Sequence, residues 1–146
     1  MEHLELLTHV YLFRDATAED LAALARIVER KFVIAGDRVY AEGDAPDAMF
    51  LIEMGRVEVR LEQRDMAIVT LGSGQAFGEL GFFARGRRSV SAYAREPTHL
   101  LRLPFDNLAQ LLDERPALAL IVYRNACRYF AAHFGQMALE RDRPYF

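Results

Sequence analysis

The sequence predicts a mainly β fold: an antiparallel β-roll or jelly roll (a double-stranded β-helix) with an N-terminal helix and two C-terminal helices. Helical spacing of apolar residues is confined to the two ends of the chain, and short strand-like runs separated by turn residues fill the middle. The chain has 146 residues, enough for one core. We expect a single domain, helical over 1–30, a β-roll over 31–103 and helical again over 104–140.

The first predicted helix is "TAEDLAALARIVER", which begins at Thr17. Thr17 is suited to cap a helix, and Glu19 and Asp20 fall in the first turn, where the helix dipole favours acidic side chains. The apolar positions recur at the helical spacing i, i+3, i+4 and i+7: Leu21, Leu24, Ala25 and Val28.

The clearest predicted strand is "RVEVRLE", in which Val57, Val59 and Leu61 alternate with charged residues that should face solvent. The preceding run "AMFLIEM" is apolar throughout and predicts a strand buried on both faces. "SVSAYAR" and "HLLRL" predict two more strands. Several short strands at this spacing are typical of a barrel or jelly roll.

Two helices are predicted at the C-terminal end. Pro104 opens a short one, and Pro116 opens a longer one that runs to about Glu140. The longer helix has an apolar seam of coiled-coil spacing: Leu120, Tyr123, Cys127, Phe130, Phe134 and Met137. A second apolar side holds Leu118, Ile121, Val122 and Tyr129. We expect one side to pack on the β-roll and the other on the same helix of a second chain, with Cys127 in the core; alternatively, one wide face packs on the roll alone.

Composition excludes several classes of protein. The net charge is −3, which argues against nucleic-acid binding by bulk positive charge. A single cysteine, Cys127, allows no internal disulfide, and neither a signal peptide nor a membrane span is evident, which fits a cytoplasmic protein. A metal-dependent cupin enzyme, also a β-roll, needs clustered histidines, and the strand region holds only His99. We therefore expect no metal and no enzyme activity.

One loop, "FGELGFFARGRRS" from Phe77 to Ser89, carries more chemistry than a connector needs. Gly78 and Gly81 allow a positive φ or the close approach of a ligand, and a short helical turn near Gly78 would present backbone N–H groups. Arg88 can bind a phosphate bidentately, and Glu79 can accept from ribose hydroxyls. The combination suggests a sugar phosphate. The alternative is a hairpin with a surface salt bridge between Glu79 and Arg88.

The loop resembles the phosphate-binding cassette of the cyclic nucleotide-binding domain family, which includes bacterial cyclic AMP receptor proteins, kinase regulatory subunits and gated channels. "FGEL" resembles the start of the cassette and "RS", at 88–89, its end. Four more segments resemble the family's segments in the family's order, so the resemblance covers roughly residues 8 to 140. They are "LFRDATAEDLAALA", "AGDRVYAEGD", "AMFLIEMGRVEV" and "PFDNLAQLL".

The resemblance implies a sensor for cyclic AMP or cyclic GMP. It places Glu79 on the ribose 2′-hydroxyl and Arg88 on the cyclic phosphate. Ser89 and the backbone of Gly78, Leu80 and Gly81 would complete the cradle. The long helix would cover the base, for which Tyr129 and His133 are our predicted pair. Arg87 stands where many members have proline, and Ser89 leaves cyclic GMP open as a ligand.

The family's receptor proteins have a helix-turn-helix domain after the long helix, whereas this sequence stops at Phe146 and "ERDRPYF" cannot form a recognition helix. We therefore expect a stand-alone sensor that binds no nucleic acid, forms a homodimer through its C-terminal helix and acts on an unknown effector protein. The alternative is a scaffold that no longer binds nucleotide and keeps the roll for dimerisation.

Overall fold

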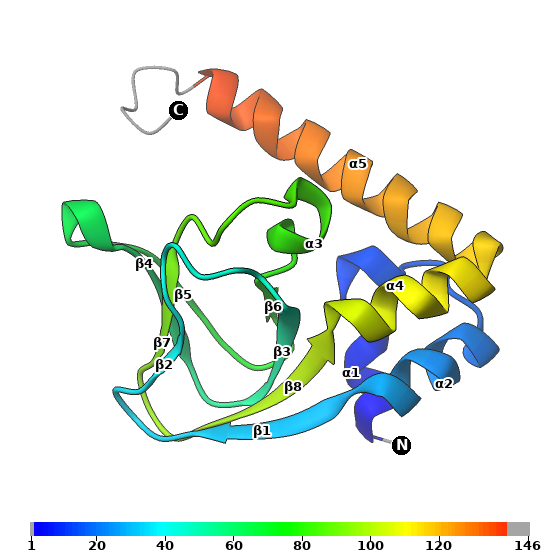
Figure 1. Cartoon of the computed structure of the whole chain (residues 1–146), viewed down its shortest axis with the longest axis horizontal. Helices are drawn as coiled ribbons and strands as arrows, with labels where there is room; N and C mark the ends of the chain where they lie inside the picture. The colour runs from blue at the N-terminus through cyan, green and yellow to red at the C-terminus, as the bar shows by residue number, and fades with distance from the viewer. Residues whose placement is uncertain (1, 140–146) are drawn as a thin grey trace.

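The computed structural model places a β-roll against helices from both ends of the chain (Figure 1). It describes residues 2–139, with side chains from 3 to 134. The strands are β1 (Glu29–Val33), β2 (Arg38–Tyr40), β3 (Ala48–Met54), β4 (Val57–Leu61), β5 (Met66–Leu71), β6 (Ala76–Phe77), β7 (Ser91–Ala94) and β8 (Thr98–Pro104). The helices are α1 (Glu2–Thr8), α2 (Ala18–Ile27), α3 (Leu80–Ala84), α4 (Phe105–Glu114) and α5 (Pro116–Leu139), with short 3₁₀ turns η1 (Tyr11–Phe13) and η2 (Glu62–Arg64).

The strands form two antiparallel four-stranded sheets, in the orders β1-β8-β3-β6 and β2-β7-β4-β5. In the first sheet β3 pairs with β8 along its whole length, from Ala48 opposite Pro104 to Met54 opposite His99, with a shift of register between Ile52 and Met54. The short strand β6 pairs with β3 through Phe50 and Phe77. This pairing attaches the start of the loop at 77–89 to β3, with β6 as the edge strand of the sheet. The predicted β-roll with flanking helices is confirmed.

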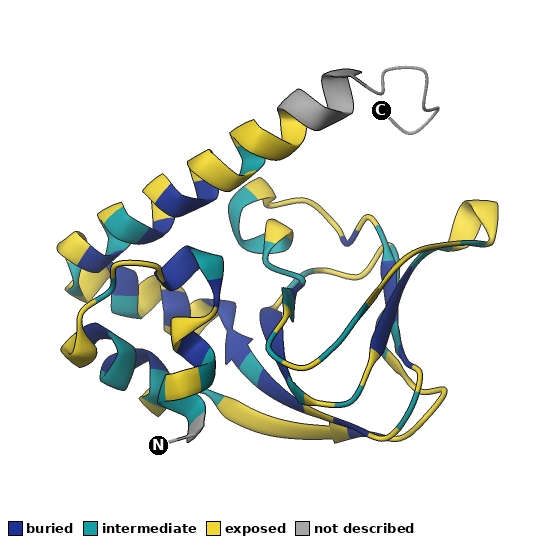
Figure 2. Cartoon of the chain, turned by 180° about the vertical axis from the view of Figure 1, so that it is seen from behind, coloured by how far each residue is buried: buried dark blue, intermediate teal, exposed yellow. Residues whose placement is uncertain are grey.

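Strands β3 and β8 are buried on both faces, which is why "AMFLIEM" and "HLLRL" show no polar alternation. One face packs inside the roll, where Phe50, Ile52 and Leu100 join residues of the second sheet. The other face carries Met49, Leu51, Leu101 and Leu103 and is covered by the helices. Figure 2 shows this division as two buried layers, one within the roll and one between the roll and the helices.

The predicted first helix is α2, and its N-terminus is the expected one. The Thr17 side chain accepts from the backbone N–H of Asp20, and the Asp20 carboxylate accepts from the backbone N–H of Thr17, a reciprocal capping box. The alternation predicted for β4 fails at one position, since Glu58 is buried. Its carboxylate binds Arg60 at 2.8 Å and Arg95 at 3.2 Å, and these arginines cover it on the sheet's outer face.

The long helix α5 packs through one face only. Leu118 and Val122 are fully buried, and Asn125 donates through its side-chain nitrogen to the carbonyls of Leu12 (3.0 Å) and Arg14 (2.9 Å) beside η1. This face of α5 packs on η1 and α4, and helices separate it from the first sheet (Figure 1).

The other apolar side of α5 is covered only in part, where Phe83 of α3 meets the edges of Tyr123 and Phe130. Leu120 is 58% exposed and Tyr123 48%. Cys127 is exposed as well, so the prediction that it lies in the core is wrong. The apolar surface of α5 is wider than the stripe that packs against η1. Only the residues in that stripe are buried, and Cys127 lies beside it. The side chain of Met137, and Glu140, lie outside the described residues. No described helix is long and apolar enough to cross a membrane.

Candidate functional site

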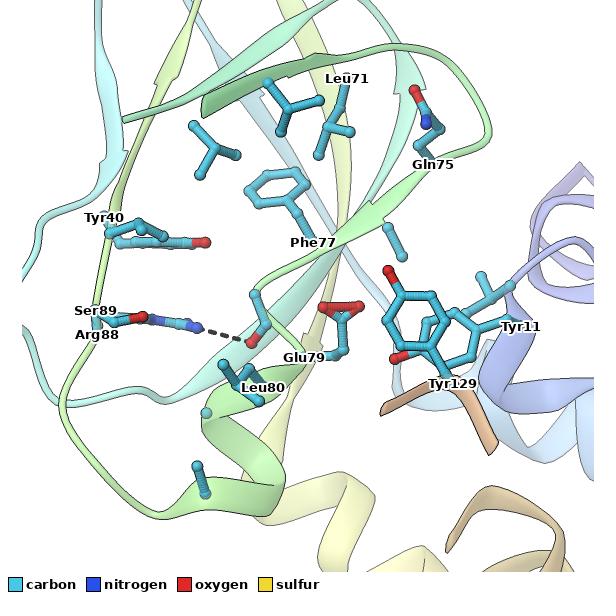
Figure 3. A pocket seen from close by; sticks show the side chains of 18 of the residues that line it. Tyr11, Tyr40, Leu71, Gln75, Phe77, Glu79, Leu80, Arg88, Ser89 and Tyr129 are labelled. Atoms are coloured by element: carbon cyan, nitrogen blue, oxygen red, sulfur yellow. Dashed lines mark hydrogen bonds between the residues drawn. The ribbon is translucent and has the colours of Figure 1, made fainter. Parts of the chain in front are cut away.

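A cavity of about 630 Å³ opens between the β-roll, the N-terminal segment and α5 (Figure 3). The loop at 77–89 forms one wall, and Val59, Val69 and Leu71 of the second sheet form another. Tyr11 of η1 and Tyr129 of α5 close the third side. The volume lies within the range usual for sites that hold small molecules. All six residues expected in the cradle line it: Gly78, Glu79, Leu80, Gly81, Arg88 and Ser89.

The two glycines of the loop are required for different reasons. Gly78 has a φ of +80°, a conformation that side chains disfavour, and a Cβ there would lie 3.1 Å from Nη1 of Arg88. At Gly81 the φ is ordinary, but a Cβ would lie 2.5 Å from Cβ of Pro46. Glycine at this position therefore lets the backbone of α3 pack directly against Pro46, which precedes β3. The short helix itself begins at Leu80, with Glu79 as its N-cap.

Arg88 is buried and holds the two ends of the loop together. Its Nη1 donates to the carbonyl of Gly78 at 2.7 Å, and its Nη2 donates to the carbonyl of Ala48 in β3. The guanidinium carbon lies 4.0 Å from the centre of the Tyr40 ring, a cation–π contact. The alternative of a surface salt bridge between Glu79 and Arg88 is therefore wrong, because Arg88 is 7% exposed and bonds to backbone.

Two of the five N–H groups of Arg88 are used by these bonds, and its Nε is buried without a partner among the described residues. Burial lowers the pKa of Arg88, which is opposed by Tyr40 and by nearby carboxylates. The buried cation beside Tyr40 does not offset the loss of water around that phenol, and the pKa of Tyr40 is raised to about 12. The cavity therefore holds a desolvated positive charge with hydrogen-bonding capacity left.

Glu79 stands in the same cavity and is half-buried. Loss of water around the carboxylate raises the pKa of Glu79, and its own backbone N–H, Tyr11 and Arg88 offset this only in part. A carboxylate whose stabilising contacts do not match its loss of water can still accept strong hydrogen bonds. Glu79 therefore offers an acceptor, and Arg88 donors, within one cavity.

Three aromatic rings connect the cavity to α5. Tyr11 and Tyr129 stack with their centres 4.1 Å apart, and His133 stacks on Tyr129 at 3.9 Å. Tyr129 lines the cavity, whereas His133 is exposed outside it, with Nδ1 2.8 Å from the carbonyl of Tyr129. The structure thus brings one of the two residues expected to cover the base to the site and leaves the other behind it.

Sequence reasoning missed four polar side chains of the cavity: His9, Tyr11, Tyr40 and Gln75. Tyr40 ends a short strand and Gln75 sits in a turn, so neither has a local signal. Tyr11 lies in a single 3₁₀ turn ahead of the first predicted helix. Among the described residues, no group of three or more histidine, cysteine or acidic side chains could hold a metal ion.

Comparison with known proteins identifies the family. A model of the cyclic nucleotide-binding domain matches residues 30–115, which include β1 to β8 apart from the first residue of β1, the whole loop and α4. The chain belongs to the cyclic nucleotide-binding domain family.

Three relatives illustrate the match. The chain is 30% identical over 120 residues to Glutaminase 2 of Bradyrhizobium diazoefficiens, covering 82% of this chain and 19% of that protein. It is 38% identical over 92 residues to the cAMP-dependent protein kinase type II regulatory subunit of Drosophila melanogaster, covering 62% and 24%. The crystal structure of Thermus thermophilus catabolite activator protein superposes with a TM-score of 0.77 at 27% identity, covering 90% of this chain and 62% of that one. The chain thus spans about a fifth to a quarter of the two curated relatives.

Substituting Glu79 by glutamine is expected to stabilise the ligand-free protein at neutral pH. Because the pKa of Glu79 is raised in the folded state, the free energy of unfolding falls as the pH rises from the ordinary pKa of a glutamate to the raised one, and stays lowered above it. The advantage of Glu79→Gln should disappear near pH ~4 and below, where folded and unfolded parent both carry the proton. Thermal unfolding followed by circular dichroism across this range measures the difference.

The matched control is Glu114→Gln, at the exposed end of α4, which should leave the melting temperature nearly unchanged at every pH. If the parent is at least as stable as Glu79→Gln at neutral pH, the ionised carboxylate does not lower the free energy of unfolding, and the prediction is wrong.

Proposed function

We propose that this cavity binds a 3′,5′-cyclic nucleotide, cyclic AMP or cyclic GMP, and that the chain is a non-catalytic sensor that relays occupancy through α5 to a partner protein. The observation that carries the proposal is the convergence of Arg88 and Glu79 in one cavity, from the two ends of a loop whose conformation Arg88 maintains. A cyclic nucleotide is a compact molecule with one anionic phosphate and one ribose hydroxyl left free. It matches the buried cation Arg88 and the acceptor Glu79. Arg87, which also lines the cavity, is by contrast exposed and donates to the carbonyl of Gly43.

Arg88 is suited to the cyclic phosphate because its guanidinium is fixed before any ligand arrives. The Tyr40 ring and two backbone carbonyls hold its plane, so little conformational entropy is lost on binding. Its remaining N–H groups can donate to phosphate oxygens as charge-assisted hydrogen bonds. Ser89 and the backbone N–H groups of Gly78, Leu80 and Gly81 would supply further donors from the same wall.

Glu79 is suited to the ribose 2′-hydroxyl, because a carboxylate accepts a hydrogen bond from a neutral hydroxyl. The same carboxylate would repel the phosphate, which therefore binds elsewhere in the cavity. Tyr129, on the opposite side of the cavity, is suited to cover the base with its ring. His133 supports that ring from behind by stacking on it, and is not itself a wall of the cavity. These assignments agree in chemistry with a purine nucleotide and leave adenine and guanine as alternatives.

The path from the cavity to α5 runs through aromatic contacts. Phe83 of α3, within the loop, meets the edges of Tyr123 (5.9 Å) and Phe130 (5.8 Å) of α5. Tyr129 meets the cavity directly. A ligand that moves the loop or Tyr129 therefore changes contacts of α5, and can shift the helix only by as much as it binds the two positions differently.

Replacing Arg88 by alanine is expected to weaken nucleotide binding by roughly 2–5 kcal/mol, or about one to four orders of magnitude in Kd. The substitution removes the charge-assisted contact with the phosphate and releases the carbonyls of Gly78 and Ala48. Isothermal titration calorimetry with cyclic AMP and with cyclic GMP measures the loss. Circular dichroism must show that the variant is folded at the titration temperature.

Arg85→Ala is the matched control, because Arg85 belongs to the same loop and carries the same charge but is exposed and does not line the cavity. It should bind within about twofold of the parent, since a solvated charge contributes little. If Arg88→Ala also binds like the parent, the phosphate lies elsewhere. If the folded parent binds neither nucleotide, the alternative of a scaffold without nucleotide binding is supported.

The partly covered apolar side of α5 supports dimerisation as a further part of the proposal. Leu120, Tyr123 and Cys127 lie three and four residues apart on this face and are exposed. Apolar side chains at this spacing are typical of a helix that pairs with a copy of itself. Phe130 is unsuited to test the dimer, because it is partly buried against the core.

Replacing Leu120 by glutamate is expected to convert a dimer into a folded monomer, because it places a charge without a partner within the proposed apolar interface. Multi-angle light scattering at about 50 μM measures the mass, a concentration well above the Kd of a stable dimer. Phe32→Glu is the control, since Phe32 is similarly exposed (53%) on β1 and lies on another face of the molecule. A parent that is monomeric at this concentration contradicts the dimer.

A further inference from the structure

We propose that Tyr11 is a second protein contact for the free ribose hydroxyl of the bound nucleotide, donating its phenolic hydrogen to the oxygen that itself donates to Glu79. The inference rests on the proposed function. It adds a residue from outside the loop to the recognition of the ribose. It also predicts a preference for ribonucleotides over their 2′-deoxy analogues to which Tyr11 contributes.

The starting observation is a buried hydroxyl without a partner. The side chain of Tyr11 lines the cavity, and its oxygen is closed to solvent, yet no atom in the described part of the chain lies at hydrogen-bonding geometry to it. Buried polar groups in proteins are nearly always hydrogen-bonded, so an exception at a cavity wall points to a missing partner. In Figure 3 the Tyr11 ring approaches the Glu79 carboxylate from the side opposite the loop.

Glu79 is close enough to this hydroxyl for a weak interaction that affects the pKa of both groups, but it does not reach the geometry of a full hydrogen bond. Burial first, and the negative charge of Glu79 second, raise the pKa of Tyr11, which therefore keeps its proton and remains a donor. Tyr11 in turn contributes to holding the raised pKa of Glu79 down. The pair is thus a donor and an acceptor, each with capacity left, at one point of the cavity.

A single hydroxyl group placed between them would satisfy both. A hydroxyl carries one donor hydrogen and two acceptor lone pairs, so it can donate to the Glu79 carboxylate and accept from Tyr11 at the same time. In a 3′,5′-cyclic nucleotide the phosphate occupies the 3′ and 5′ oxygens. The 2′-hydroxyl is consequently the one free hydroxyl on the sugar, and no other sugar atom can fill this role.

The position of Tyr11 is fixed by two contacts with α5. The carbonyls of Leu12 and Arg14, which follow it in the chain, accept from Asn125. One turn further along α5, the Tyr129 ring lies on the Tyr11 ring at 4.1 Å with an angle of 18° between the planes. A donor held in this way loses little conformational entropy when a ligand binds. Its hydrogen bond can therefore distinguish a ribose from a 2′-deoxyribose.

The test is a double-mutant-type cycle in which one hydroxyl is removed from the protein, one from the ligand, or both. Calorimetry measures Kd for cyclic AMP, cyclic GMP and the 2′-deoxy analogue of each, with the parent and with Tyr11→Phe. The substitution removes one oxygen and keeps the ring that stacks on Tyr129. We expect it to weaken the ribonucleotides about tenfold and to leave the Kd of the deoxy analogues unchanged, so that the preference for ribose falls about tenfold.

Two controls separate this result from a change in the fold. Tyr93→Phe, on β7 outside the cavity, removes a hydroxyl that bonds to Glu62 and should leave all four Kd values unchanged. Tyr11→Phe itself should melt no lower than the parent without ligand, because the lost hydroxyl has no partner there.

An equal loss for ribo and deoxy ligands, or no loss for either, overturns the role of Tyr11 while the proposed function stands. A lower melting temperature of ligand-free Tyr11→Phe overturns the claim that its hydroxyl is unpartnered. A parent that binds neither cyclic nucleotide overturns both this inference and the proposed function.

Discussion

The buried guanidinium of Arg88 is the interaction on which the site depends. It joins Gly78, at the start of the loop, to Ala48 in the doubly buried strand β3, and it lies flat on Tyr40. A buried charge is stable only if it is paired or hydrogen-bonded, so the loop must keep the one conformation in which these carbonyls face it. The positive φ of Gly78 is part of that conformation. The same residue therefore shapes the wall of the cavity and supplies its positive charge.

A second constraint comes from outside the loop. The N-terminal turn η1 is held against α5 by the Asn125 side chain and by the stack of Tyr11 on Tyr129. Because Phe83 in α3 also meets α5, the helix contacts both the loop and the segment that faces it. Two walls of the cavity, the loop and η1, therefore meet the same helix. A ligand that bridges the loop and η1 must act on that helix, which gives the proposed sensor a physical output.

The sequence predicted the parts of the structure that have local signals. The capping box at Thr17 and the alternation of β4 are periodic or positional features, and both are found, with Glu58 as an exception that only the covering arginines explain. The loop was singled out because glycines, one acid and three arginines in thirteen positions are unusual together, and the roles of its residues came from the resemblance to the family's cassette.

What sequence could not predict depends on contacts between distant segments. Nothing near Tyr11 or Tyr40 shows that these rings face the loop, since their partners lie far along the chain. The exposure of Cys127 has the same origin, because the stripe of α5 that becomes buried is decided by where η1 docks. The role of Arg88 was predicted in part. Its charge is evident from the sequence, but its hydrogen bonds to the carbonyls of Gly78 and Ala48 are seen only in the folded structure.

The central claim is that a cyclic nucleotide occupies this cavity and that α5 senses it. Hydrogen–deuterium exchange of the parent, with and without saturating cyclic AMP or cyclic GMP, tests both statements at once. The account predicts slower exchange of backbone amides at 77–89 and, in the same experiment, in α5 around 129–134, with neither change in Arg88→Ala. Unchanged exchange at 77–89 under conditions where the nucleotide is bound would contradict the account, because the ligand would then lie in another place.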